Sequence, residues 1–323
     1  GGDFAPAEVI RGALKAGRDH GAHVILVGNT AKIREAADSE GLDISHLDIE
    51  ESTREIGMDD SPSDVLKNKK ESSIYIGSQL VGQGKGSAFL SAGNTGAVMA
   101  CSLFNIKRIK GVFRPAIAAV IPLADSKFVL IDAGANADCK PAYLAQFALM
   151  GKVYSENILG VADPKISIVN IGEEEKKGNE FAVETHKILK DMEGLNFVGN
   201  IEGREMFKGD ADVVVTDGFT GNVMLKIIEG VAKMFFGEIK SVLTSSLTSK
   251  IAALMLKKPL MSMKNKFNYE TYGGAQLLGL NAPVIISHGS SKAKAVSNAI
   301  RVGQESLKTD LIEKIKKEID IYR

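Results

Sequence analysis

Five times along this chain, an apolar segment typical of a strand runs into a short loop rich in Gly, Asn, Asp, Ser and Thr, and a helical segment follows. The loops cover residues 91–96, 132–136, 170–178, 216–222 and 287–291. Strands that alternate with helices predict an α/β fold, with a mostly parallel sheet and helices on both faces. Loops at the carboxyl ends of such strands bind ligands. Together the five loops therefore predict a site for a small anion.

The expected strands are short apolar runs without regular alternation, which is typical of strands buried on both faces. They cover residues 23–29, 47–53, 87–91, 116–122, 128–132, 166–171, 196–199, 212–216 and 284–287. Helical patterns lie between them, for example over residues 6–20, 95–107, 142–156, 178–191 and 220–243. No repeat or low-complexity linker marks a domain boundary. We expect one compact unit over residues 1–323, with either one large core or two interlocked subdomains.

Composition limits the classes of partner. The chain has 40 basic and 40 acidic side chains, so no overall field draws it to nucleic acid. Its two cysteines, Cys101 and Cys139, show no metal-binding spacing and fit a reducing cytoplasm. No apolar run reaches transmembrane length, and we expect neither a metal nor a redox cofactor. The opening GGDFAP is typical of a strand-to-helix turn, which suggests that a strand precedes it in the natural protein.

The segment from residue 244 to 267 departs from the alternation of strand and helix. It reads TSSLTSKIAALMLKKPLMSMKNKF, which is apolar and rich in methionine and lysine. Helical spacing places Ile251, Leu254 and Met255 on one face, with Lys257 and Lys258 beside it. One interpretation is a protruding helical hairpin that packs in a dimer interface. The other is an amphipathic element that binds anionic lipid weakly and reversibly.

Two loops carry more polar groups than a turn needs. Residues 216–222 combine two glycines with polar side chains at the start of a long helix, and the candidates there are Asp217, Thr220, Asn222 and Lys226. Residues 287–291 repeat the pattern before another helix, with His288, Ser290 and Ser291. Hydroxyl groups and free N–H groups at a helix start are typical of a phosphate or oxyanion site.

The remaining loops also allow simpler interpretations. Residues 91–96 can form a tight turn with Gly96, in which Asn94 or Thr95 caps the helix. Asp132 ends a strand and can be a metal ligand, whereas Asp138 fits a cap or turn better. The acids of residues 170–178 complement a helix dipole, which leaves Lys177 as the candidate in that loop.

Taken in order, the segments GGDFAP, SAGNTGA, DAGAN, IGEEEKKGNE, VVTDGFTGNVMLK and YGGAQLLG…SHGSS closely resemble the bacterial phosphate acyltransferase family of phospholipid synthesis. The match is colinear over nearly the whole chain. The resemblance implies an isocitrate/isopropylmalate dehydrogenase-like fold and a homodimer. It also implies transfer of a fatty acyl group from acyl carrier protein to inorganic phosphate. The product is an acyl phosphate for a membrane glycerol-3-phosphate acyltransferase, which suits a cytoplasmic protein at the membrane surface.

The resemblance also assigns site residues by position. It implicates Asp3, Asn94, Thr95, Asp132, Asn136, Lys177, Asp217, Thr220, Asn222, Lys226, Tyr272 and His288. The candidates for chemistry among them are Lys226, Lys177, Asp217, Asn222 and His288. One departure is Gln276, where family members often have proline, and we interpret it as a local turn change.

The proposed chemistry needs little acid or base help. Phosphate is already anionic, and a thiol of pKa ~8.5 is a good leaving group. The protein must then position two reactants and stabilise an oxyanion, which favours direct displacement. We expect the phosphate to lie among Asn94, Thr95, Asn222, Ser290 and Ser291. The alternatives are an acyl-enzyme on Cys139, an NAD-dependent β-decarboxylating dehydrogenase, and a non-enzymatic anion-sensing scaffold at the membrane surface.

An acidic carrier protein needs a local basic patch on a protein of zero net charge. The densest one outside the apolar segment is formed by Lys107, Arg108, Lys110 and Arg114. The alternative interpretation of these residues is a solvated helix end.

Overall fold

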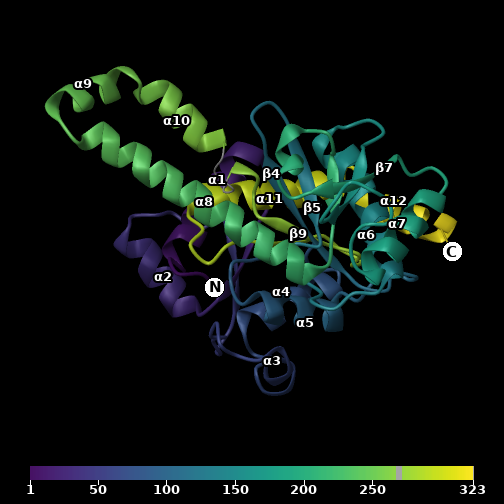
Figure 1. Ribbon diagram of the computed structural model, residues 1–323. Helices are drawn as coiled ribbons and strands as arrows, with labels where there is room; N and C mark the ends of the chain where they lie inside the picture. The colour runs from purple at the N-terminus through teal and green to yellow at the C-terminus, as the bar shows by residue number, and fades with distance from the viewer. Residues whose placement is uncertain (267–270, 323) are drawn as a thin grey trace.

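The computed structural model describes residues 1–266 and 271–322, and an eight-stranded sheet lies at its centre (Figure 1). The strand order is β3-β10-β9-β4-β5-β8-β6-β7. The strands are β3 (Phe89–Ser91), β4 (Ala116–Pro122), β5 (Lys127–Ile131), β6 (Ile166–Asn170), β7 (Phe197–Glu202), β8 (Val213–Val215), β9 (Ala275–Leu278) and β10 (Val284–Ile286). The predicted α/β fold is confirmed, and of these strands only β9 was not predicted.

Two short connections make the sheet mixed. Residues 123–126 join β4 to β5, and residues 279–283 join β9 to β10. These lengths allow only hairpins, because a parallel crossover needs a dozen or more residues. Accordingly β4 pairs antiparallel with β5 and β9, and β9 pairs antiparallel with β10. The other neighbours pair parallel, so β3 and β10 run opposite to β5, β8, β6 and β7.

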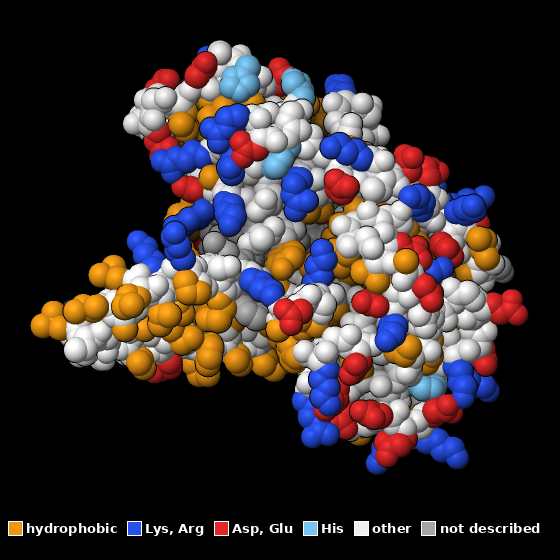
Figure 2. Space-filling model, turned by 90° about the horizontal axis from the view of Figure 1, so that it is seen from above, with side chains coloured by type: hydrophobic (Ala, Val, Ile, Leu, Met, Phe, Trp, Pro, Cys, Tyr) orange, Lys and Arg blue, Asp and Glu red, His pale blue; other side chains and the backbone are white. Residues whose placement is uncertain are grey.

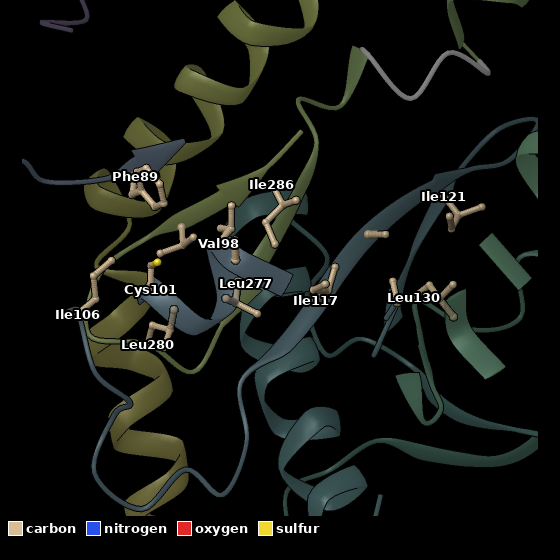
Figure 3. Close-up of a cluster of buried hydrophobic side chains, with 14 of the residues drawn as sticks. Phe89, Val98, Cys101, Ile106, Ile117, Ile121, Leu130, Leu277, Leu280 and Ile286 are labelled. Atoms are coloured by element: carbon tan, nitrogen blue, oxygen red, sulfur yellow. The ribbon is translucent and has the colours of Figure 1, made fainter. Parts of the chain in front are cut away.

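Helices cover both faces of the sheet (Figure 1). They are α3 (Pro62–Asn68), α4 (Ser73–Gly82), α5 (Thr95–Asn105), α6 (Pro141–Tyr154), α7 (Glu180–Asp191), α8 (Gly218–Thr244), α11 (Ala293–Lys308) and α12 (Leu311–Tyr322), with the short turns η1 (Ser155–Leu159) and η2 (Glu205–Lys208). One buried cluster joins α4 and α5 to the sheet, and in Figure 3 Val98 and Cys101 of α5 lie over Leu277 and Ile286. A second cluster joins α6, α7 and α12 to the sheet.

The N-terminal part forms a small layer of its own. A two-stranded parallel sheet, β1 (Ile25–Gly28) with β2 (Asp48–Glu51), packs with α1 (Ala7–His20) and α2 (Thr30–Ser39) around a separate buried cluster. Helix α1 also lies against α11, where Gly12 leaves room for Val296. A methyl group at Gly12 would lie 2.5 Å from Cβ of Val296.

A long arm leaves the body of the protein (Figure 1). Helix α8 has 27 residues, of which only Gly218 and Gly221 are buried. Helices α9 (Leu247–Met255) and α10 (Lys257–Lys266) then fold back beside it, and no residue of α9 is buried. These two helices form the hairpin predicted over residues 244–267, although residue 267 lies outside the described residues. No helix of the described part has the length and apolarity needed to cross a bilayer.

Candidate active site

The five glycine-rich loops lie at two edges of the sheet. Because β5, β8 and β6 are parallel, the loops after them meet at one edge, called here the first edge. Strands β3 and β10 run the other way, so residues 91–96 and 287–291 lie at the opposite, second edge. The expected single cluster of loops is therefore not found, because the two hairpins leave β3, β4 and β10 running opposite to the other five strands.

Asp132 organises the first edge. Its side chain is 0% exposed and accepts five N–H donors: Oδ1 from Ile117, Gly134 and Ala135 at 3.0, 3.1 and 2.9 Å, and Oδ2 from the backbone and the side-chain amide of Asn136, both at 2.8 Å. Burial raises the pKa of Asp132, while these donors oppose the rise. Both oxygens are thus occupied by the protein, so Asp132 and Asn136 hold this loop rather than present groups to an anion.

The start of α8 packs directly on that loop. Asp217 caps the helix, with Oδ1 accepting from the Thr220 N–H at 2.9 Å and Oδ2 from the Thr220 hydroxyl at 2.8 Å. The Gly218 N–H donates to the Asn136 carbonyl at 2.7 Å. A side chain at Gly221 would overlap the carbonyl oxygen of Asp132. Two glycines therefore allow a contact that a side chain at either position would block.

Three further candidates are exposed at or beyond this edge. Asn222 lies beside Gly134 at the start of α8. Lys226 lies one turn farther along α8 and pairs with Glu229 at 2.8 Å. The third candidate, Lys177, is exposed in the loop after β6, and its carbonyl accepts the side-chain amide of Asn170 at 2.9 Å. Helix α8 packs on the same buried cluster as α5. It therefore runs across that face of the sheet, from the first edge toward the second.

The second edge is built by three segments distant in sequence. The Asp3 N–H donates to the Gly289 carbonyl at 2.7 Å, and the Ser287 N–H donates to the Ser91 carbonyl at 2.9 Å. A methyl group at Gly1 would lie 2.9 Å from Cα of Gly93. The N-terminal residues and the loops after β3 and β10 therefore form one assembly. Tyr272, half-buried, precedes β9 at the same edge.

Asn94 is committed to building this assembly. Its Oδ1 caps α5 by accepting from the Ala97 N–H at 2.9 Å, and its amide donates to the carbonyls of Gly57, Met58 and Asp60 at 2.8–3.2 Å. In the described residues, the N–H groups of Thr95 and Gly96 at the start of α5 donate to no acceptor of the protein. Two open donors at a helix N-terminus are what a small anion binds.

The loop after β10 is less open. Nδ1 of His288 lies 2.7 Å from the Ser290 hydroxyl and accepts the Ser290 N–H at 3.1 Å. The Ser291 N–H donates to the carbonyl of His288 at 2.9 Å. At the start of α11, the N–H of Ala293 donates to Oε2 of Glu8 at 2.7 Å. Sequence reasoning missed Glu8, because it reaches this helix from a position near the other end of the chain.

The two thiols are poor nucleophiles. Burial raises the pKa of Cys101 and of Cys139 to about 11, so both are protonated at neutral pH. The Sγ atom of Cys139 donates to the Asn136 carbonyl at 3.5 Å. An acyl-enzyme on Cys139 needs a thiolate, which this environment disfavours.

Known proteins resemble this chain over nearly its whole length. The family model described as "Fatty acid synthesis protein" matches residues 1–314. The phosphate acyltransferase of Anoxybacillus flavithermus is 47% identical over 323 residues, which cover 99% of this chain and 96% of that protein. The phosphate acyltransferase of Dictyoglomus turgidum is 45% identical over 316 residues, covering 98% of this chain and 94% of that protein.

Solved structures show the same fold at low identity. A phosphotransacetylase from Streptococcus pyogenes matches with a TM-score of 0.65 and 18% identity, covering 94% of this chain and 92% of that chain. A 4-hydroxythreonine-4-phosphate dehydrogenase from Klebsiella pneumoniae matches with a TM-score of 0.52 and 12% identity, covering 92% of this chain and 94% of that chain. The expected dehydrogenase-like fold is thus confirmed.

Proposed function

Because this chain belongs to the phosphate acyltransferase family, we propose that it transfers a fatty acyl group from acyl carrier protein to inorganic phosphate by direct displacement. Membership makes the chain an acyltransferase and leaves the dehydrogenase alternative without support. In the proposed step, a phosphate oxygen attacks the thioester carbonyl carbon. The C–O bond forms, the C–S bond breaks, and the thiolate of the carrier leaves and takes up a proton.

The observation that supports a phosphate site most directly is the pair of open N–H groups at Thr95 and Gly96. The first edge is a poorer place for phosphate, because the buried carboxylate of Asp132 already occupies its N–H donors. The second edge adds His288, Ser290 and the exposed Lys292, whose Nζ lies 5.4 Å from the ring centroid of Phe4. We therefore place phosphate at the start of α5.

The experiment that tests this function combines acyl carrier protein thioester with the protein, with and without phosphate, and measures the thiol released. Release that requires phosphate supports acyl transfer to phosphate. Release at the same rate without phosphate would identify a thioesterase instead.

Replacing Thr95 by proline tests the phosphate site without breaking the helix. Proline is tolerated at the first helical position, and the ψ of 114° at Asn94 suits a residue before proline. The change removes one of the two open N–H groups, so the KM for phosphate should rise about tenfold, which corresponds to ~1.4 kcal/mol. Steady-state kinetics with varied phosphate measures this.

A matched control is Glu180→Pro in α7. Its N-cap Asn179 also accepts the N–H of the third helical residue, and its ψ of 171° also suits a residue before proline. That variant should keep the wild-type KM for phosphate. A KM that rises equally in both variants, or in neither, would contradict a phosphate site at α5.

We also propose that the arm attaches the protein to the membrane surface, where a membrane glycerol-3-phosphate acyltransferase consumes the labile product. Figure 2 shows hydrophobic side chains gathered along the protruding arm. Ile251, Leu254 and Met255 are 61, 72 and 81% exposed, and Lys257 and Lys258 lie beside them at the start of α10. Such binding should be weak, because each lysine near anionic lipid contributes only ~1 kcal/mol.

A homodimer is proposed from the stripe along α8. Its apolar residues recur every fourth position and are each 43–67% exposed: Phe219, Val223, Ile227, Val231 and Phe235. Exposed apolar stripes of this length are typical of surfaces that a partner covers. The exposed apolar residues continue from α8 into the hairpin of α9 and α10. The hairpin can therefore contact either a second copy of the chain or a lipid surface.

Replacing Leu254 by glutamate separates these interpretations. A charge at the centre of the apolar face should abolish co-sedimentation with anionic liposomes and leave activity in solution unchanged. Ile321→Glu is the control, because Ile321 is 71% exposed on α12, outside the arm. Liposome sedimentation measures lipid binding, phosphate-dependent thiol release measures activity, and light scattering measures the oligomeric state. An inactive monomer in the Leu254 variant would instead identify the hairpin as a dimer interface.

A further inference from the structure

We propose that the loop of residues 106–115, called here the basic loop, is the docking surface for the acidic acyl carrier protein, an inference that rests on the proposed function. In Figure 3 this loop leaves the buried cluster after Ile106 and returns to it at Ile117. Its exposed residues include four cations, Lys107, Arg108, Lys110 and Arg114. The loop also carries the exposed ring of Phe113, at 46% exposure, and Phe104, at 56%, lies in the last turn of α5 just before the loop.

The loop is held in one conformation by two polar side chains, the exposed Asn281 and the buried Gln146. Asn281 donates its side-chain amide to the carbonyls of Ile106, Lys107 and Arg108 at 3.3, 3.2 and 3.0 Å. Gln146, 1% exposed, accepts the Phe113 N–H at 2.7 Å and donates to the Gly111 carbonyl at 2.9 Å. A surface already fixed in this way loses little conformational entropy when a partner binds.

The cations of the loop are available for an outside partner. In the described part of the chain, none of the four forms an ion pair with a carboxylate. Arg108 differs from the others, because its guanidinium donates to the carbonyls of Val112 and Phe113 and so builds the loop. Arg114 lies 5.9 Å from the ring of Tyr143, which also stacks against Phe113. Lys107, Lys110 and Arg114 are thus the side chains that present charge.

The basic loop is connected to the candidate active site. The side-chain amide of Asn136 donates to the carbonyl of Pro115 at 2.8 Å, and Ile117, which follows, donates to Asp132. The loop follows α5, whose other end carries the open N–H groups of Thr95 and Gly96. Eleven helical residues span about 16 Å at 1.5 Å per residue. The extended prosthetic arm of a carrier protein can cover that length from a dock at the basic loop.

The combination of unpaired cations with exposed aromatic rings fits an acidic protein surface better than other anionic partners. Arg and aromatic side chains are the groups that contribute most at protein interfaces. Because the protein has zero net charge, the attraction must come from this patch and must weaken as salt increases.

The test is the double charge reversal Lys110→Glu with Arg114→Glu. The matched control is Lys187→Glu with Lys317→Glu, which changes net charge equally at two exposed lysines on α7 and α12. Binding of fluorescently labelled acyl carrier protein is measured by anisotropy. Transfer is measured with two donors, acyl carrier protein thioester and acyl-pantetheine, which lacks the protein. The patch variant should bind the carrier about tenfold more weakly and show a KM for it raised to the same extent. Its kinetics with acyl-pantetheine should be unchanged.

Unchanged carrier binding in the patch variant, or equal weakening in the control, would overturn the docking surface. Loss of activity with both donors would show that the loop supports the fold or the site rather than the carrier. Weakened binding to anionic liposomes with unchanged carrier binding would assign the patch to lipid. If carrier binding depends on the patch but the protein shows no phosphate-dependent transfer, the proposed function is refuted and the docking surface remains supported.

Discussion

Replacing Asp132 by asparagine is expected to destabilise the protein by about 4 kcal/mol and to abolish acyl transfer. Both carboxylate oxygens accept only from N–H groups. The amide nitrogen of asparagine is itself a donor, so at either position it would face other donors. At 0% exposure, water cannot replace the lost partners. Because the same loop supports the start of α8, the first-edge candidates Asn222 and Lys226 should lose their positions with it. Chemical denaturation and phosphate-dependent thiol release measure the two effects.

Asp138→Asn is the control for this change. Asp138 lies in the same loop and is exposed, so the same chemical substitution should change stability by less than about 0.5 kcal/mol. A stable, active Asp132 variant would show that the carboxylate does not hold the first edge.

Replacing Gly221 by alanine is expected to cost about 3 kcal/mol in the free energy of unfolding and most of the activity. The added methyl group would overlap the carbonyl oxygen of Asp132, a backbone atom that cannot rotate away. Helix α8 would have to move off the loop that supports it, and Asn222 and Lys226 would move with it. Thermal unfolding followed by circular dichroism, together with kinetics, measures the change.

The same substitution at Gly230 provides a matched control in the same helix. A methyl group there meets nothing within 4 Å, so helix propensity alone decides the sign. Gly230→Ala should stabilise the protein by ~0.5–1 kcal/mol and leave activity unchanged. If both variants behave alike, the close approach at Gly221 does not support the site.

The fold could be predicted from the sequence to the extent that local patterns specify it. The buried strands and the helices between them are apolar runs of clear length, and the structure places β4, β5 and β6 where the pattern predicts them. Strand β9 was missed because its residues 275–278 follow two glycines and form only a short apolar run. The direction of the strands follows from connection lengths, and the short link 123–126 between β4 and β5 was the available signal for a mixed sheet. The link 279–283 gave no signal, because β9 was not predicted.

The candidate site was less predictable, because the role of a polar residue depends on contacts distant in sequence. Asp132 has the same surroundings in sequence whether its oxygens face a ligand or five N–H groups. Asn94 was recognised as a possible cap. Its hydrogen bonds to the carbonyls of Gly57, Met58 and Asp60 reach a loop distant in sequence, and no local pattern indicates that contact. Glu8 reaches Ala293 across almost the entire chain.

Direct displacement is tested most directly by a single turnover with acyl carrier protein carrying a radiolabelled acyl chain, with enzyme in excess and phosphate present. Acyl phosphate, free thiol and protein-bound label are counted in the same sample. Direct displacement requires that acyl phosphate equals the thiol released, and that no label is bound to the protein with or without phosphate. Label attached covalently to the protein in the absence of phosphate, and lost when phosphate is added, would contradict direct displacement. Thiol release without any acyl phosphate would contradict acyl transfer to phosphate itself.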